Sequence, residues 1–206
     1  MSTINNAATV GNANNIIFEG NTNIVGNIGS ADNRFNNIKF TGNNGTAKLT
    51  GPIYANNIDF NSNNIVILDN LVTLNGTTHI NGNIDLGHNK LIFQDNQNGN
   101  STWGANTVLS TTFYADNTLG TIEIQTPVEA EGVVNITVND HAVLSREAQK
   151  HLFITTGGLL TNANFNVIKT NAYIDWLVEV GNNQNIYLYS LNNAQHVIVG
   201  DIYNSG

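Results

Sequence analysis

A short asparagine-flanked apolar phrase recurs along the first half of the chain and places the strongest constraint on its fold. The phrase reads NNIIF at Asn14–Phe18, NNIKF at Asn36–Phe40, NNIDF at Asn56–Phe60 and, more loosely, NKLIF at Asn89–Phe93. The four phenylalanines are separated by 22, 20 and 33 residues, so the third interval carries an insertion. A unit of this length that recurs in sequence is typical of repeat architectures.

A second phrase precedes the first in each repeat. It has an aliphatic residue, then glycine two positions later and isoleucine two positions after that, and it begins at Ile24, Leu49 and Ile80. Apolar residues alternate with others in both phrases, which is the period of a half-buried strand and not of a helix. We therefore predict two inward columns of stacked side chains. One contains Phe18, Phe40, Phe60 and Phe93, and the other contains Ile24, Leu49 and Ile80.

The fixed order of the two phrases favours a coil of parallel strands in which each lap hydrogen-bonds to the next. Because parallel crossovers are almost always right-handed, we predict an all-β, right-handed parallel β-helix. An antiparallel sandwich is the alternative, since Asn-Gly pairs that favour hairpins begin at Asn44, Asn75 and Asn81. Hairpins do not explain two phrases in fixed order, so the β-helix is favoured.

Asparagine carries most of the polar content. Charged residues make up only 11% of the chain, against about a quarter in an ordinary globular protein. By contrast, 40 residues are asparagine, 26 of them within the first 100. Asparagine tolerates left-handed backbone, so clusters such as FNSNN predict turns. Asparagine side chains stacked along a repeat can also form amide ladders.

The sequence changes in character after Trp103. The last 106 residues contain only 14 asparagines and neither phrase. The run TIEIQTPVEAEGVVNITVND predicts longer alternating strands, Ser145–Phe153 predicts a short helix, and NFNVIKTN, YIDWLVEV and NIYLYSL predict three strands. We therefore divide the chain into asparagine-rich laps over 1–104 and a β-rich capping region over 105–206 that continues or closes the coil.

These laps, with stretches such as GNIGS, NNIKFTGN and AKLTG, and the tail FNVIKTNAYIDWLVEVGNNQNIYLYSL resemble the passenger region of Gram-negative autotransporters. The similarity is greatest to rickettsial surface antigens of the OmpA and OmpB type. It implies a β-helix on the bacterial cell surface or outside the cell, as part of a longer exported precursor with an outer-membrane barrel. It also implies an autochaperone-like folding nucleus near the C-terminal end. We assign this nucleus to Phe165, Tyr173, Trp176 and Tyr187.

The segment itself is not expected to insert into a membrane. Its first 15 residues lack the basic and apolar regions of a signal peptide. No apolar run reaches the roughly eighteen residues that can span a bilayer. We therefore expect an excised piece of a longer exported protein.

Few residues suit catalysis or metal binding. The sequence has no nucleophile-elbow, P-loop or dinucleotide glycine motif, and no cysteine to serve as a thiol nucleophile. Its histidines do not have metal-ligand spacing, so we predict no metal and no cofactor. They are His79, His88, His141, His151 and His196.

Four aspartates are candidates for the acids of a carbohydrate-active enzyme with parallel coiled strands: Asp59, Asp69, Asp85 and Asp95. Asp59 alternates with apolar neighbours and so points outward, as does Lys39. If their laps are adjacent, the two form a surface ion pair in a column with Ile17 and Ile92. No convergent acid pair is evident, so we predict no catalytic residue.

The formal net charge of −8 excludes the basic surface that nucleic acids require and disfavours anionic membranes. The predicted function is that of a non-enzymatic surface passenger segment that adheres to host cells through a host-cell surface protein or glycan. A carbohydrate-active or tail-spike-like enzyme fragment is the alternative. The sequence does not indicate which residues bind the partner.

Overall fold

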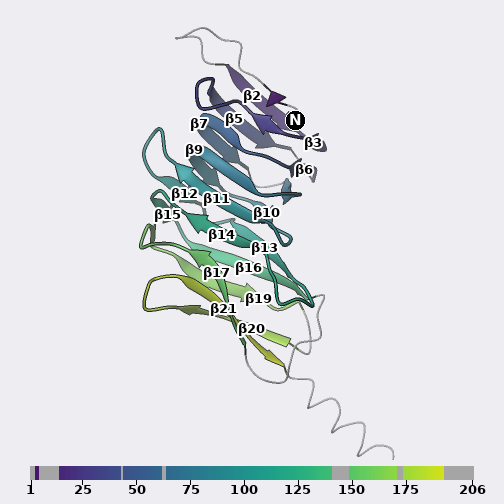
Figure 1. The fold of residues 1–206 in the computed structure, drawn as a ribbon, viewed down its shortest axis with the longest axis vertical. Coiled ribbons are helices and arrows are strands. Elements are labelled where there is room, and N and C mark those ends of the chain that lie inside the picture. Colours follow the sequence, from purple (N-terminus) through teal and green to yellow (C-terminus); the bar gives the residue numbers. More distant parts are fainter. Residues whose placement is uncertain are drawn as a thin grey trace, which may run out of the picture.

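The computed structural model describes residues 3–4, 14–42, 44–61, 64–140, 149–170 and 174–192. In these ranges all regular structure is β-strand, so the all-β prediction is confirmed there. The strands form one sheet of 14 and one of 7, stacked along the long axis of the molecule (Figure 1). Across these residues we find no helix of the length and apolarity needed to cross a membrane.

The larger sheet holds strands from the whole length of the chain. They are β1 (Thr3–Ile4), β2 (Asn15–Glu19), β4 (Asn27–Ile28), β5 (Phe35–Thr41), β7 (Ile53–Phe60), β9 (Val72–Ile80), β11 (Lys90–Asp95), β12 (Ser101–Trp103), β14 (Thr121–Ile124), β15 (Val128–Ala130), β17 (Gln149–Thr155), β18 (Leu160–Thr161), β20 (Ile174–Val180) and β21 (Ile186–Asn192). The smaller sheet holds β3 (Thr22–Ile24), β6 (Thr46–Leu49), β8 (Ile65–Leu68), β10 (Asn83–Asp85), β13 (Val108–Phe113), β16 (Val133–Asp140) and β19 (Asn164–Ile168).

From β2 onward the chain alternates between the two sheets, and we call one passage through both a lap. Strands of successive laps pair in parallel, as β5 does with β7 and β6 with β8. Among the described strands, antiparallel pairing occurs between β17 and β21 and between β20 and β21. The Asn-Gly pairs at Asn44 and Asn81 lie where the chain changes sheets, and Asn75 lies inside β9. None of these three pairs forms the turn of a hairpin, because the flanking strands do not pair with each other.

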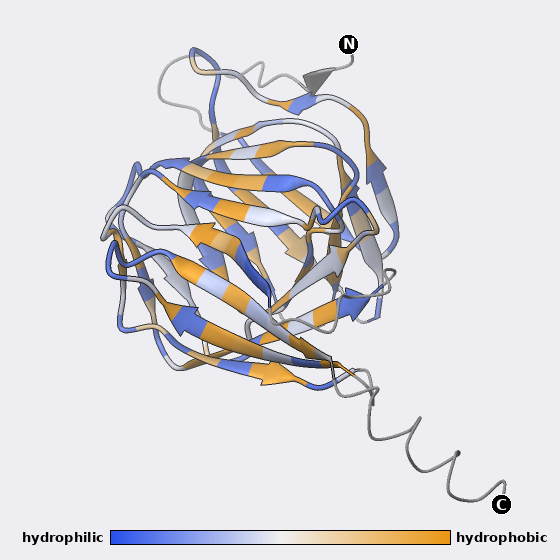
Figure 2. Ribbon diagram, turned by 60° about the horizontal axis from the view of Figure 1, so that its bottom comes forward, coloured by the Kyte–Doolittle hydropathy of each residue, from blue (hydrophilic) through white to orange (hydrophobic). Residues whose placement is uncertain are grey.

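The alternating sequence buries one side of most of the described strands, and polar and apolar segments alternate along the ribbons in Figure 2. Phe18, Phe40 and Phe60 pair in register across β2, β5 and β7. Their rings stack with centroids 5.0 and 4.9 Å apart. In the smaller sheet, Ile24 and Leu49 also pair in register.

The insertion in the third repeat changes both predicted columns. In the phenylalanine column, the residue that pairs with Phe60 on the next strand is Ile80, and the residue that pairs with Ile80 is Trp103. Phe93 is therefore not in this column. Phe93 pairs with Leu74 instead. This correction arises because β9 is nine residues long and pairs with β11 along its first half and with β12 at its end.

Ile80 is likewise not in the column of Ile24 and Leu49. Leu49 is followed in register by Leu68 on β8. Ile24 and Leu49 end strands of the smaller sheet, whereas Ile80 ends β9 of the larger one. The second phrase therefore crosses from the smaller to the larger sheet in its first two occurrences and in the opposite direction in its third.

In the C-terminal half, the structure confirms the predicted strands but not the predicted helix. The three predicted strands are confirmed as β19, β20 and β21. The predicted helix is wrong over residues 149–153, which belong to β17, while 145–148 lie outside the described residues. Buried Phe153 and Ile154 and the pairing of β17 with two strands override the helix propensity there. The run predicted as longer strands contains the short strands β14 and β15 and the longer β16. A corner at Pro127, which has no backbone N–H to donate, separates the first two.

Candidate binding surface

The outer face of the larger sheet carries a ladder of asparagine amides. Asn37 donates through Nδ2 to Asn15 Oδ1 at 2.8 Å, and Asn57 donates to Asn37 at 3.0 Å. Asn98, in the loop after β11, extends the ladder by donating to Asn57 at 3.2 Å. The predicted amide ladder is therefore confirmed. We call each amide-to-amide hydrogen bond of the ladder a rung. In each rung the side-chain amide of one asparagine donates to that of another, so the ladder is polar but carries no net charge.

A column of mixed charge runs beside this ladder. Lys39, Asp59, His79, Thr102 and Glu129 follow one another in register across β5, β7, β9, β12 and β15. Lys39 Nζ lies 3.9 Å from Asp59 Oδ2, so the predicted surface ion pair is confirmed. His79 Nδ1 lies 2.8 Å from Thr102 Oγ1. The column places a cation, an anion and an imidazole on successive strands.

This column borders a shallow hollow of about 220 Å³. Lys39, Asp59 and His79 line it together with Thr41, Phe60, Asn61 and Asn81. Ile17 shares the column, as predicted, because it pairs with Lys39. Ile92 does not, because it lies on β11 and pairs with Thr73 and Glu123. The same insertion that moves Phe93 out of its predicted column moves Ile92.

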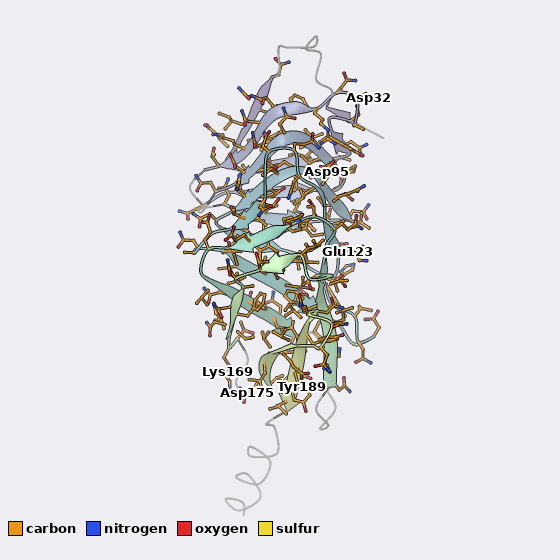
Figure 3. All side chains as sticks on the ribbon, turned by 90° about the vertical axis from the view of Figure 1, so that its left-hand side faces the viewer. Asp32, Asp95, Glu123, Lys169, Asp175 and Tyr189 are labelled. Carbon is orange, nitrogen blue, oxygen red and sulfur yellow. The ribbon has the colours of Figure 1, made fainter. Side chains whose placement is uncertain are left out.

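An arginine that the sequence did not single out ties several laps together. Arg34 precedes β5 and donates to the carbonyl of Asn75 at 2.6 Å and to Asp95 Oδ2 at 2.8 Å. Its guanidinium carbon also lies 5.7 Å from the centre of the Tyr54 ring. Figure 3 shows Asp95 between Asp32, near the N-terminal end, and Glu123. Arg34 and Asp95 are 61 residues apart, and no local pattern indicates their contact.

The four candidate aspartates are distributed over both sheets and a corner. Asp59 lies on the larger sheet and Asp85 on the smaller one, where Asp85 Oδ1 accepts a bond from the Gly87 amide. Asp69 is exposed at the corner after β8, and Asp95 binds Arg34. Two acids that cleave a glycosidic bond must flank it within about 10 Å of each other. The observed contacts of Asp85 and Asp95 are instead those of hydrogen-bond and ion-pair acceptors.

The described histidines are also dispersed. His79 contacts Thr102, His88 contacts Tyr114, and His151 packs against Phe113. The described ranges contain no group of three or more histidine and acidic side chains placed to hold a metal ion. His141 and His196 lie outside those ranges.

Two surface carboxylates are stabilised in their charged form. Hydrogen bonds from Gln125 and Lys90 lower the pKa of Glu123, and those from the Thr118 side chain and amide lower the pKa of Asp116. Both carboxylates therefore suit the role of hydrogen-bond acceptor rather than general acid. Burial lowers the pKa of His151, which favours its neutral imidazole.

The residues assigned to the folding nucleus have different environments. Trp176 is buried, packs 5.5 Å from Phe113 between ring centres, and donates through Nε1 to Asp140 at 2.9 Å. Phe165 is half-buried and lines a hollow beside β19. The ring of Tyr187 lies 4.4 Å below Lys150 Nζ. Tyr173 lies outside the described residues. The assignment of the nucleus stays a prediction.

The sequence of the chain is similar to one family of known proteins along most of its length. Residues 2–187 match the family profile of Rickettsia outer membrane protein B, passenger domain. The chain is 35% identical over 209 residues to outer membrane protein B of Rickettsia prowazekii (strain Madrid E) and 36% identical to that of Rickettsia typhi (strain ATCC VR-144 / Wilmington). Each alignment covers 96% of this chain but only 12% of the relative. No solved structure matches the chain significantly.

Proposed function

The chain belongs to the passenger-domain family of Rickettsia outer membrane protein B, and from this membership we propose that it is a non-enzymatic, adhesive segment of a bacterial surface protein. We place it on the cell surface, as part of a longer exported precursor. An outer-membrane barrel is expected in the full-length chain. The adhesive partner would be a protein or glycan on the host cell.

We further propose that the laps form a right-handed parallel β-helix. Two observations support this: the chain alternates between two sheets, and successive laps pair in parallel register. The hand follows from the strong preference of parallel crossovers. Laps over 1–104 and a capping region over 105–206 remain our division. The antiparallel pairing of β20 and β21 supports a cap in the second part, although parallel pairing continues from β10 to β13.

The observation that carries the adhesive function is the outer face of the larger sheet, with its amide ladder and its mixed-charge column. Amide groups can donate and accept hydrogen bonds to uncharged polar partners. Because each rung of the ladder is held by its neighbours, the surface is ordered before a partner arrives, which lowers the entropy cost of binding. A broad contact with little charge follows from this arrangement.

The test uses residues 1–206 coupled to beads and incubated with cultured host cells. We expect the beads to bind, and the double change Asn37→Ala and Asn57→Ala to reduce the number of attached beads. The matched control is the double change Asn135→Ala and Asn166→Ala, which removes a corresponding 2.9 Å amide rung from the smaller sheet. Equal loss from both pairs of changes would contradict the assignment of the larger sheet.

Salt provides a second readout. The acidic chain should not bind polyanions, so attachment should persist from low to physiological salt and heparin should not compete. If binding disappears over this range, or if the unaltered segment binds no cells, the adhesive function is wrong as proposed.

A further inference from the structure

Two loops that are distant in sequence form an aromatic hollow away from the amide ladder. One loop follows β10 and contains His88, and the other follows β13 and contains Tyr114. Their rings meet edge to face, with centres 5.0 Å apart and planes at 90°. Both side chains are exposed, and with Asp116 and Thr118 they line a hollow of about 370 Å³. Ligand sites are commonly lined by aromatic side chains together with a few polar or charged groups.

The base of the hollow is held together by backbone hydrogen bonds. The carbonyl of Gly87 accepts bonds from the amides of Thr112 at 2.8 Å and Gly120 at 3.1 Å. The hydroxyl of Thr111 donates to the carbonyl of Gly120 at 2.8 Å. A Cβ at position 120 would lie 2.6 Å from the Gly87 carbonyl oxygen, so this close approach requires glycine. The relative position of the two loops is therefore constrained.

The tip of the second loop is also closed by hydrogen bonds. The Tyr114 amide donates to the carbonyl of Thr118 at 2.9 Å, and the Asn117 amide donates to the carbonyl of Tyr114 at 3.0 Å. Asn117 adopts a left-handed backbone with φ of 63°, which asparagine tolerates. Tyr114 is thus presented by an ordered turn, and little conformational entropy should be lost on binding.

Asp116 supplies a fixed acceptor next to the rings. Its Oδ1 accepts hydrogen bonds from the amide and hydroxyl of Thr118, at 3.1 and 2.5 Å. These bonds also lower the pKa of the carboxyl, so it remains ionised at neutral pH. The second carboxylate oxygen retains lone pairs that can accept bonds from a ligand hydroxyl.

The chemistry of this hollow fits a sugar better than an anion or a cation. A pyranose ring has an apolar face of C–H groups that can pack on an aromatic ring, and hydroxyls at its rim that can bond to a carboxylate and an imidazole. An acidic ligand would be repelled by Asp116 and by the net charge of −8. A metal ion would need more ligands than one carboxylate and one histidine.

We propose that His88, Tyr114 and Asp116 form a binding site for a neutral hexose at the end of a host-cell glycan. This site deepens the adhesive function proposed above and rests on it, but it occupies corner loops rather than the amide ladder. Insertions and corner loops of repeat proteins often carry binding sites, because the repeated strands hold them in place.

The test measures binding of residues 1–206 to an array of mammalian glycans with neutral, sialylated and sulfated termini. We expect binding to at least one neutral terminus and weaker binding to its sialylated form. Tyr114→Ala and Asp116→Asn should each lower affinity at least about tenfold, because each removes a principal contact. Tyr114→Phe, which keeps the ring, should change affinity by less than about threefold.

Asp32→Asn is the matched control, since it makes the same acid-to-amide change in another exposed loop and should leave affinity unchanged. Circular dichroism of each variant checks the fold. Absence of binding to neutral glycans, preference for sialylated glycans, or equal binding by Tyr114→Ala overturns the site.

The bead assay separates this inference from the adhesive function. Cell binding without glycan binding would reject the hexose site and retain adhesion. Glycan binding without cell binding would retain the site and reject adhesion. If both are correct, Tyr114→Ala should weaken attachment to cells, and exhaustive periodate oxidation, which cleaves the vicinal diols of hexose rings on the cell surface, should do the same.

Discussion

The asparagine-rich laps and the C-terminal strands are stabilised in different ways. In the laps, like residues stack on like residues, as Phe40 does on Phe18 and Phe60, and every strand depends on a neighbour about 20 residues or more away. At the C-terminal end, β20 and β21 form an antiparallel pair joined by a short turn, and Trp176 packs against Phe113. Antiparallel strands can pair through local contacts, whereas parallel strands cannot.

This difference indicates an order of folding. A lap gains its hydrogen bonds only when the adjacent lap is already in place, so its stability is a sum of neighbour terms. A hairpin with large aromatic anchors can form earlier and provide an edge for the laps. The comparison can be tested by breaking each region in turn.

Division of the chain between residues 104 and 105 should have the largest effect on stability. We expect residues 105–206 to unfold cooperatively as an isolated fragment, and residues 1–104 to show no cooperative transition. The division separates β10 from β13 and β12 from β15, so each fragment loses the same strand pairings. The lost pairings alone would therefore not explain a difference between the fragments. Circular dichroism during urea unfolding of each fragment measures this. A cooperative transition in 1–104 alone would reverse the proposed order.

Substitution of Trp176 should be the most destabilising single change. Trp176→Ala should cost about 3–5 kcal/mol for the lost aromatic side chain and about 1 kcal/mol more for the hydrogen bond to Asp140. The control is Leu177→Ala in the same strand, where the side chain is 51% exposed and the expected cost is below about 0.5 kcal/mol. Free energies of unfolding in urea provide the measurement. Similar costs for the two variants would argue against an anchoring role.

Phe40 tests the stacked column of the laps. Phe40→Ala should cost about 3–5 kcal/mol, because the ring is fully buried between two others. We expect this cost to be smaller than that of Trp176→Ala. Lys39→Ala, one residue away on the outer face, should cost at most about 1 kcal/mol. Equal urea midpoints for the Phe40 and Lys39 variants would contradict the observed register.

The amide ladder should contribute less to the stability of the fold than the buried aromatic side chains do. Asn57→Ala removes a side chain that donates to Asn37 and accepts from Asn98, so it should cost about 0.5–1.5 kcal/mol. Asn166→Ala removes a single rung, to Asn135, and should cost less. Thermal unfolding of both variants makes the comparison. A larger loss for Asn166→Ala would show that the ladder is not the source of the effect.

The smallest expected effect is the contribution of His151 to the pH dependence of stability. Because the pKa of His151 is lowered in the folded state, the unfolded chain binds more protons near pH 6 and stability falls as pH drops below about 6.5. The loss levels off below the folded-state pKa. His151→Phe should reduce the difference between urea midpoints at pH 7.5 and 5.5. An unchanged difference would assign the pH dependence to other groups.

Local patterns predicted the strands and their buried sides well. Alternation at Ile38 and Phe40 indicated which face is buried, and outward Lys39 and Asp59 were expected to meet if their laps were adjacent. The tail strands were also predicted, because their apolar runs are bounded by turn residues. These features depend on residues that are near one another in sequence or on an evenly spaced repeat.

The site at the corner loops was not predicted. His88 and Tyr114 are 26 residues apart and belong to no repeated phrase, so no sequence pattern indicates that they meet. The only local signal was the short polar stretch YADN between apolar strands. Their contact depends on the close approach of Gly87 and Gly120, which is a property of the folded backbone.

The sequence by itself determined the all-β character of the described chain, the inward phenylalanines of the first three repeats, the amide ladder and the acidic surface. It could do so because side-chain alternation and composition act locally. The tertiary structure decided that Ile80 and Trp103 follow Phe60, that Phe93 belongs to another column, and that residues 149–153 are a strand. These outcomes depend on how insertions shift one lap against the next, and that register is set by long-range hydrogen bonds and packing rather than by any local pattern.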